Sequence, residues 1–358
     1  MRNRAYMQMR ERFINAAKVQ KKPIMGHFEL TARCNLDCKM CYVHTQDNAE
    51  ALRKELSTEQ WKRIFDEAYD CEMLYATLSG GECLVRKDFK ELYLYLWNKK
   101  VRITVMTNGV LLNCDYVEFF KTYQPDRIQI SLYGSNEDGY LRITGHKGFE
   151  KAIAAISALK EAGIDVLATI TANRYLYDDY LDILKLCHEK GFSVNTNTLL
   201  IPNREDPNKN DYYLTDEEMF LLSKSGAELK KTLVPVEVTP EPFGSMCGEP
   251  AYGLPCNAGN CLATITYDGK MYPCINAMVG GASLLEMSYA EAWEQTKKAA
   301  AEIQQSMECV GCAYDKTCPK CPAFRLKDLY SGHCNTAVCQ MTRRLVAAGV
   351  KKLKPADE

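Results

Sequence analysis

The sequence predicts an α/β fold in which a partial (β/α)6 TIM-like barrel is followed by a loop-rich region held together by metal clusters. From about residue 26 to residue 200, short β-forming runs alternate with longer amphipathic runs. This alternation is typical of right-handed βαβ units with a parallel sheet. About six units are visible, which favours an open barrel over a closed one of eight. Ten of the 17 cysteines lie in residues 240–358, where apolar periodicity is too weak to predict a second large core.

The expected strands are short and rich in β-branched residues, and helical periodicity separates them. We expect strands at 26–31, 74–79, 101–107, 127–132, 164–171 and 192–199. We expect the intervening helices at 58–69, 88–99, 116–123, 149–162 and 177–190. Ser57 and Gln60 have the spacing of a capping box at the start of the first helix, and Gly163 and Gly191 end the last two.

Five consecutive segments follow from this pattern. They are an N-terminal helical extension (1–24), the partial barrel (25–201), a bridging region (202–246), a cysteine-rich domain (247–340) and a C-terminal helix or tail (341–358). The extension contains one basic helix over 5–22, and the bridging region contains one helix over 215–231. In the cysteine-rich domain we expect a helix over 288–305 and a hairpin of 262–266 and 270–272, turned at Asp268-Gly269.

Composition excludes several classes of protein. The 45 Lys and Arg residues balance 46 Asp and Glu residues, for a net charge of −1, so we expect no nucleic acid and no membrane as a partner. No apolar stretch reaches the roughly 18 residues of a transmembrane helix. An odd number of cysteines without a secretory signal argues against a disulfide framework. We therefore expect a cytoplasmic protein in an oxygen-sensitive setting, with thiolates that bind metal.

Three cysteines directly follow the first expected strand. Cys34, Cys38 and Cys41 have the spacing C-x3-C-x2-C, and the carboxyl ends of barrel strands are where ligands bind. Three thiolates on a 4Fe–4S cluster leave one iron without a protein ligand. A structural zinc site is the alternative, but it needs four ligands and the local sequence supplies three.

Further motifs end the next three strands. Ser79-Gly80-Gly81-Glu82 ends the second, Thr107-Asn108-Gly109 the third, and Ile130-Ser131-Leu132-Tyr133-Gly134 the fourth. The glycines permit close approach, and Glu82 offers a carboxylate to an ammonium group. In this order, and together with the three cysteines, the motifs resemble those of the radical S-adenosylmethionine (SAM) superfamily.

The resemblance implies specific roles. Cys34, Cys38 and Cys41 would hold the catalytic 4Fe–4S cluster, whose open iron chelates SAM. The SAM-binding residues would be Met40 beside the adenine, Gly80, Gly81 and Glu82 at the amino group, Thr107, Asn108 and Ser131 at the ribose and carboxylate, and Arg142 at the carboxylate. One electron would then cleave SAM to a 5′-deoxyadenosyl radical that abstracts a substrate hydrogen. A flavodoxin- or ferredoxin-type protein would supply the electron.

The C-terminal cysteines resemble the SPASM extension of radical SAM enzymes, which binds two auxiliary 4Fe–4S clusters. The first half, Cys256-x12-Gly269-x4-Cys274, fits the pattern. The second half departs once, with two residues rather than three between Cys318 and Cys321. The resemblance assigns Cys256, Cys261, Cys274 and Cys321 to the first auxiliary cluster, and Cys309, Cys312, Cys318 and Cys339 to the second, with Cys334 as the alternative to Cys339. Three 4Fe–4S clusters are expected in all.

SPASM enzymes mostly act on peptides, so the expected function is an oxidoreductase that forms a crosslinked or oxidised residue in a peptide or protein. Only 33 residues precede Cys34, too few for a leader-recognition domain, so a separate leader-binding protein is a possible partner. A small-molecule (sugar or alcohol) radical dehydrogenase is an alternative. An anaerobic sulfatase-maturating enzyme is disfavoured because Ile275 stands where those enzymes carry an aspartate. A non-enzymatic Fe–S electron carrier would leave Gly80, Gly81, Glu82 and Asn108 without a task.

Overall fold

The computed structural model describes residues 4–43, 48–198, 200, 211–232, 253–303, 312–314, 317–319, 321–323 and 336–353. Its centre is a sheet of six parallel strands that follow one another in chain order. They are β1 (Met25–Glu29), β2 (Tyr75–Ser79), β3 (Arg102–Thr107), β4 (Arg127–Ser131), β5 (Val166–Thr171) and β6 (Ser193–Asn197). Strand β1 pairs with β2 from Met25↔Tyr75 to Glu29↔Ser79, which places their carboxyl ends at one edge. The predicted partial barrel is confirmed.

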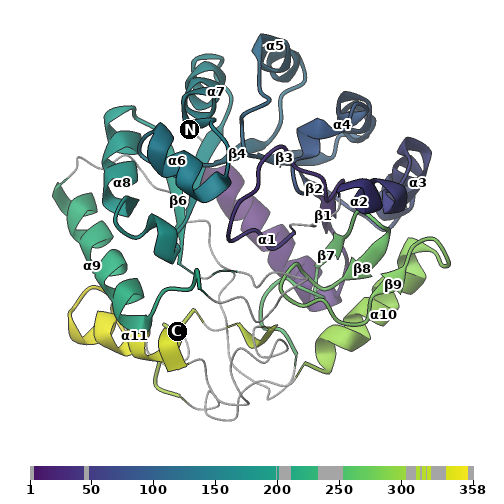
Figure 1. The fold of residues 1–358 in the computed structure, drawn as a ribbon. Coiled ribbons are helices and arrows are strands. Elements are labelled where there is room, and N and C mark those ends of the chain that lie inside the picture. The colour runs from purple at the N-terminus through teal and green to yellow at the C-terminus, as the bar shows by residue number, and fades with distance from the viewer. Residues whose placement is uncertain are drawn as a thin grey trace.

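Helices cover the outer face of this sheet, as Figure 1 shows. They agree with the predicted helices to within a few residues: α3 (Thr58–Asp70), α4 (Phe89–Asn98), α5 (Cys114–Thr122), α7 (Phe149–Glu161) and α8 (Tyr180–Glu189). Outside the barrel, the predictions for α1 (Arg4–Gln20), α9 (Asp216–Thr232) and α10 (Tyr289–Ala301) are also confirmed, and α11 (Thr336–Ala347) begins earlier than expected. Four short elements were not predicted, because they are too brief to show periodicity: α2 (Asn48–Lys54), η1 (Cys83–Val85), α6 (Glu137–Thr144) and η2 (Arg174–Leu176).

The predicted hairpin forms, but it belongs to the barrel sheet. Strand β7 (Leu262–Ile265) pairs in parallel with β1, and β8 (Lys270–Tyr272) and β9 (Ala282–Ser283) follow antiparallel. The sheet therefore has nine strands in the order β6-β5-β4-β3-β2-β1-β7-β8-β9. A hairpin this short has little stability alone, and β1 would otherwise present an unpaired edge. Pairing them removes both problems and extends the sheet across the boundary expected at residue 247.

Helix α1 packs across the amino ends of the strands. Tyr6 stacks on the guanidinium of Arg102, the first residue of β3, and Arg10 lies 5.1 Å from the ring of Tyr75, the first residue of β2. Near its end, Ala17 joins a small buried cluster with Ile24, just before β1. In Figure 1 α1 accordingly passes behind the strands. The amino ends of the strands are thus covered by α1, and the carboxyl ends by the loops described below.

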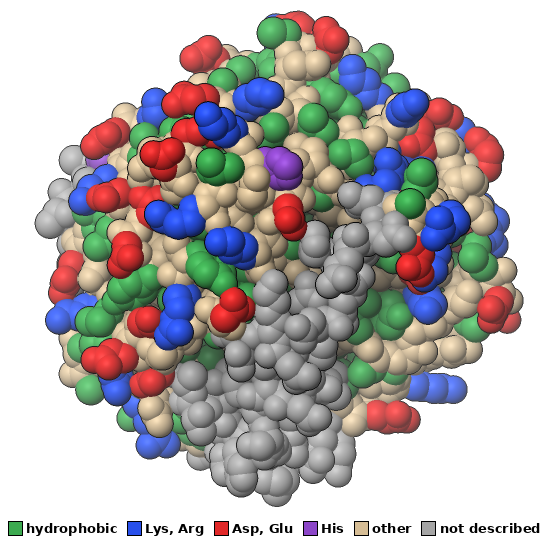
Figure 2. Space-filling view, viewed as in Figure 1, with side chains coloured by type: hydrophobic (Ala, Val, Ile, Leu, Met, Phe, Trp, Pro, Cys, Tyr) green, Lys and Arg blue, Asp and Glu red, His purple; other side chains and the backbone are tan. Residues whose placement is uncertain are grey.

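The main apolar core lies between the sheet and the helices. Phe28 on β1 meets Phe65 on α3 edge to face, with ring centroids 5.0 Å apart, and both are fully buried together with Trp61. A second, much smaller cluster consists of six buried residues in the C-terminal region: Leu254, Ala258, Ala277, Ala300, Ile303 and Ala323. On the face drawn in Figure 2, charged side chains of both signs are intermixed.

Among the helices of the described residues, none is both long and apolar enough to cross a lipid bilayer.

Candidate active site

The segment after β1, residues 30–41, forms what we call the cluster loop. It runs beside the loop that follows β2, because the amide of Gly81 donates to the carbonyl of Thr31 at 2.7 Å and that of Glu82 to Arg33 at 2.9 Å. Gly80 has φ +147°, and a Cβ there would lie 2.3 Å from the carbonyl oxygen of Thr31. A Cβ on Gly81 would lie 2.5 Å from the carbonyl oxygen of Arg33. The glycine pair therefore permits the two loops to touch.

The cluster loop brings three half-buried thiols together. Burial raises the pKa of Cys34 to about 12, against the effect of the Leu36 amide, which donates to its Sγ at 3.4 Å. Burial also raises the pKa of Cys38, and the neighbouring Cys41 and Cys34 raise it further. Buried thiols that lie this close become stable thiolates only when a metal replaces their protons.

This donor set fits a 4Fe–4S cluster. Thiolates are the usual ligands of such clusters, and amide N–H groups that point at the sulfurs stabilise them. In the described part of the chain, no three His, Cys, Asp or Glu side chains are arranged to hold one metal ion in common. The thiolates of a 4Fe–4S cluster each bind a different iron, so they do not need to converge on a single point.

Glu82 is fully buried at the end of β2. Its Oε1 accepts hydrogen bonds from the amide of Leu84 (3.0 Å) and the hydroxyl of Thr107 (2.8 Å), and its Oε2 accepts from the amide of Asn108 (2.7 Å). Burial raises the pKa of this carboxyl, while these three donors and the thiol of Cys83, 3.8 Å from Oε1, act to lower it. The carboxylate therefore ties the end of β2 to the end of β3.

Asn108 links the end of β3 to the cluster loop. Its side-chain Nδ2 donates to Oδ1 of Asn35 at 2.8 Å and lies 3.8 Å from the sulfur of Cys34, while its Oδ1 accepts from the amide of Val110. The fold thus brings together three residues predicted for one site, Cys34, Glu82 and Asn108, which follow three different strands. Asn35 is a partner that the motifs did not indicate, because nothing in sequence relates it to residue 108.

The other predicted SAM-binding residues occupy the same end of the barrel. Met40 is buried in the cluster loop, Thr107 is buried at the end of β3, and Ser131 is half-buried at the end of β4. Arg142 is exposed on α6.

Helix α6 carries the far end of the cluster loop. The carbonyls of Thr144 and Ile143 accept from the amides of Asp37 (2.8 Å) and Lys39 (3.1 Å). Gly145 ends this helix with φ +73°, and a Cβ there would lie 3.2 Å from Asp37. The loop that holds the cysteines is therefore fixed at both of its ends.

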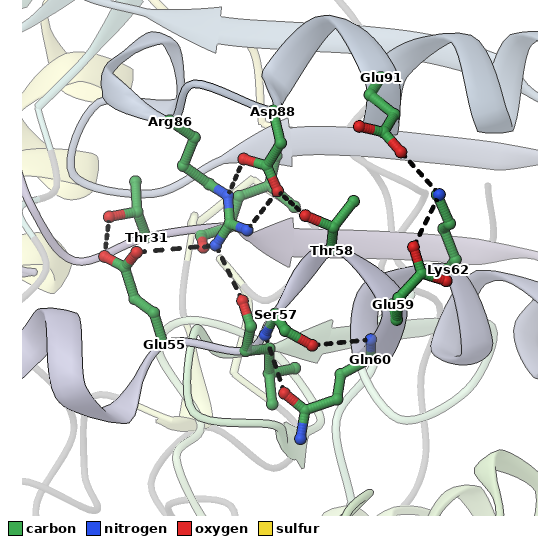
Figure 3. Close-up of polar contacts among 12 residues, drawn as sticks. Thr31, Glu55, Ser57, Thr58, Glu59, Gln60, Lys62, Arg86, Asp88 and Glu91 are labelled. Carbon is green, nitrogen blue, oxygen red and sulfur yellow. Dashed lines mark hydrogen bonds and ion pairs between the residues drawn. The ribbon is translucent and has the colours of Figure 1, made fainter.

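A buried ion network supports the near end of the cluster loop (Figure 3). Glu55 accepts from both Nε and Nη2 of Arg33 at 2.9 Å, and from the hydroxyl of Thr31. Arg86 donates from Nη1 to the carbonyls of Leu30 (3.0 Å) and Leu56 (3.1 Å), and from Nη2 to Asp88 at 2.6 Å. Sequence reasoning missed this network. The available signal was Arg86-x-Asp88 directly after a buried strand, but its partner Glu55 lies 31 positions earlier.

The cysteines predicted for the first auxiliary cluster are neighbours at the other end of the sheet. Cys256 and Cys261 precede β7, and Cys274 follows β8, whose antiparallel course returns the chain to the start of β7. Cys256, Cys274 and Cys321 pack on the same small apolar cluster. Burial raises the pKa of Cys274 to about 12, and the adjacent Cys321 and Cys256 add to the rise. Cys261 neighbours Cys256 but is fully buried against Ala17 of α1.

The second auxiliary set is described in part. Cys309 and Cys334 lie outside the described residues, and Cys318 packs against the main core. Cys339 accepts a hydrogen bond from Arg343 on α11, and this contact, with the nearby Cys312, raises the pKa of the arginine. Cys339 lies inside α11, one turn after its start. Cys312 and Cys339 are therefore brought close to one guanidinium.

Comparison with known proteins decides the family. Residues 28–174 match the model of the radical SAM superfamily. The chain belongs to this superfamily. It is 26% identical over 325 residues to an AdoMet-dependent heme synthase of Methanosarcina barkeri, covering 84% of this chain and 91% of that protein. It is also 26% identical over 313 residues to the mycofactocin maturase MftC of Mycolicibacterium smegmatis, covering 83% and 77%. This radical SAM enzyme is therefore homologous to SPASM-type maturases along most of its length.

Solved structures share the fold. The structure of anSMEcpe with bound AdoMet superposes with a TM-score of 0.72 at 17% identity, covering 92% of this chain and 98% of that one. Streptococcus suis SuiB bound to its precursor peptide SuiA gives a TM-score of 0.68 at 17% identity, covering 95% and 82%. Both superpositions include the C-terminal region as well as the barrel, so the barrel and its cysteine-rich extension form one shared architecture.

Proposed function

We propose that this radical SAM enzyme removes a hydrogen atom from a peptide or protein side chain and produces a crosslinked or oxidised residue. The observation that carries the proposal is the gathering of Cys256, Cys261, Cys274 and Cys321 at the edge of the barrel's own sheet. Such a set suits an auxiliary cluster that accepts the electron left behind when a substrate radical is oxidised. The similarity to a maturase along most of the chain supports it.

Each residue of the site has a proposed task. Cys34, Cys38 and Cys41 hold the SAM-binding cluster. Gly80, Gly81, Thr107, Asn108 and Ser131 line the SAM site, with Met40 beside the adenine and Arg142 at the carboxylate. Glu82 lies at the amino group of SAM, and its hydrogen bonds from Leu84, Thr107 and Asn108 also hold the ends of β2 and β3 together. When bound, the cluster and SAM together supply the 5′-deoxyadenosyl radical that abstracts the hydrogen.

Two auxiliary 4Fe–4S clusters complete the proposed cofactors. The first uses Cys256, Cys261, Cys274 and Cys321, and the second Cys309, Cys312, Cys318 and Cys339. A flavodoxin- or ferredoxin-type protein delivers the electron. Relatives of the same fold have been solved with peptides bound, SuiB with SuiA and anSMEcpe with a Cp18Cys peptide, which supports a peptide as the substrate.

The test is direct. Reduced enzyme is incubated anaerobically with SAM and each peptide encoded beside its gene, and the products are analysed by mass spectrometry. We expect 5′-deoxyadenosine together with a peptide that has lost hydrogen atoms. The variant with Cys34, Cys38 and Cys41 all changed to Ala is the matched control and should give neither product. Unchanged masses for every neighbouring peptide, with 5′-deoxyadenosine still formed, would reject a peptide substrate.

A second candidate is the modification of an iron porphyrin. The similarity to a heme synthase, which covers 91% of that protein, favours it, as does a 32% identical segment of an Fe-coproporphyrin III synthase from the same organism. Adding Fe-coproporphyrin III to the same assay separates the two candidates. Oxidation of the porphyrin, with every peptide unchanged, would replace the first proposal with the second.

A further inference from the structure

Two lysines at the end of α1 contact the loop that carries two of the auxiliary cysteines. Lys18 donates from Nζ to the carbonyl of Pro255 at 2.6 Å, and Pro255 directly precedes Cys256. Lys21 donates from Nζ to Oδ1 of Asn260, and Asn260 directly precedes Cys261. Each ammonium group is thus held one residue away from a predicted cluster ligand.

The contacted loop contains several hydrogen bonds of its own. The side-chain Nδ2 of the buried Asn260 donates to the carbonyls of Leu254 and Cys256, each at 2.7 Å. The carbonyl of Asn257 accepts from the amides of Asn260, Cys261 and Leu262 at 2.9–3.0 Å. None of these hydrogen bonds involves the lysines. The lysine contacts therefore add positive charge to the loop rather than the bonds that define its turns.

The backbone conformation of Lys21 is unusual for a residue that is not glycine. Lys21 has φ 56°, the left-handed conformation that glycine favours just after a helix. Its carbonyl accepts from Nε1 of Trp293 at 2.8 Å, which fixes the end of α1 against α10. In place of the glycine that this conformation favours, the chain carries a side chain whose ammonium group contacts Asn260.

Both ammonium groups lie beside the backbone that carries the ligands, Lys18 at the residue before Cys256 and Lys21 at the residue before Cys261. Lys18 is half-buried and Lys21 is exposed, so solvent screens the charge of Lys21 more strongly.

We propose that Lys18 and Lys21 are positioning and tuning residues that raise the reduction potential of the first auxiliary cluster. This inference rests on the proposed function only in assuming a cluster at Cys256, Cys261, Cys274 and Cys321. A cluster that accepts one electron becomes more negative by one charge, and a fixed cation next to its ligands stabilises the reduced form. The N-terminal helix thereby makes that cluster a better acceptor for the electron that a substrate radical gives up.

The experiment measures potential and needs neither SAM nor substrate. In the background with Cys34, Cys38 and Cys41 changed to Ala, only auxiliary clusters remain to be titrated with dithionite and followed by electron paramagnetic resonance. Lys18→Met, Lys21→Gly and the double variant are compared with Lys22→Met. Lys22 is the matched control, because it is the next residue in the chain and pairs with Glu72 at 2.6 Å. Lys18→Arg with Lys21→Arg keeps both charges.

We expect one midpoint to move to more negative potential, more for Lys18→Met than for Lys21→Gly. At the original midpoint, the ratio of reduced to oxidised cluster should fall about tenfold in the double variant. The Lys22→Met and double-Arg variants should keep the original midpoint. If the double variant keeps its full iron content and its midpoints equal those of the background protein, the proposal is overturned. The same shift in the double-Arg variant, or loss of iron from the double variant, would also overturn it. Absence of iron from the Cys256 set in the background protein would instead refute the auxiliary cluster itself.

Discussion

The two cysteine sites lie at opposite ends of the parallel strands of one sheet and are supported in different ways. The cluster loop lies at the carboxyl ends of β1–β3, where Asn108 and the Arg86 network satisfy its polar groups. The Cys256 set lies at the amino end of β7, about 15 Å away along strands of this length. Its own apolar cluster has six residues, four of them alanines.

This difference teaches where metal is needed for folding. The large core and the buried hydrogen bonds shape the first site before any iron binds. The second site buries too little apolar surface to order its loops alone, so its clusters contribute free energy to folding as well as redox chemistry. The four changes below test this contrast, from the largest expected effect to the smallest.

Changing Cys34, Cys38 and Cys41 together to Ala should abolish SAM cleavage, because these three thiols are the proposed ligands of the cluster that binds SAM. The two auxiliary clusters should remain, leaving about eight irons per chain. Chromatographic detection of 5′-deoxyadenosine and an iron assay check both points. Cleavage at an unchanged rate would refute the assignment of the SAM-binding cluster.

Removing iron with a chelator and an oxidant should loosen the second region first. We expect amide hydrogen exchange to speed up by several orders of magnitude at residues 253–261, while β2, β3 and β4 keep their protection. Mass-spectrometric exchange before and after iron removal measures the contrast. Equal loss of protection in both regions would mean that the barrel also depends on metal.

Changing Arg86 to Met should lower the free energy of unfolding by about 3–5 kcal/mol, because it leaves Asp88 without its cation and the carbonyls of Leu30 and Leu56 without their donor. The control is Lys62→Met, which removes the pairs with the exposed Glu59 and Glu91 shown in Figure 3 and a cation–π contact with Tyr95, and should leave stability nearly unchanged. Urea denaturation of both variants decides. Similar midpoints for the two would show that the Arg86 network adds no more than a surface pair.

Changing Glu82 to Gln should cost about 1–3 kcal/mol of stability, since an amide cannot accept all three hydrogen bonds that the carboxylate accepts. Because Glu82 is also proposed to bind the amino group of SAM, the same change should weaken SAM binding. Urea denaturation and equilibrium binding of SAM, measured together, separate these roles. Glu59→Gln, at an exposed position on α3, serves as the control for changing a glutamate to glutamine.

Much of the fold was predictable from local pattern. The six strands and the long helices are visible because each repeats its apolar residues over enough positions, and Ser57 with Gln60 forms the expected capping box at the start of α3. Helices α2 and α6 are too short for such a signal. The bonds from α6 to Asp37 and Lys39 join segments about 105 residues apart, and no local pattern records a contact of that kind.

The sequence by itself determined which residues carry the chemistry, because cysteine spacing and the motifs at strand ends are local properties of the chain. Only the tertiary structure decided what surrounds them. It placed β7 beside β1, turned the carboxylate of Glu82 inward to its three donors, and set Lys18 and Lys21 against the Cys256 loop. These arrangements depend on pairing and packing between distant segments, and their free energy exists only once the chain has folded.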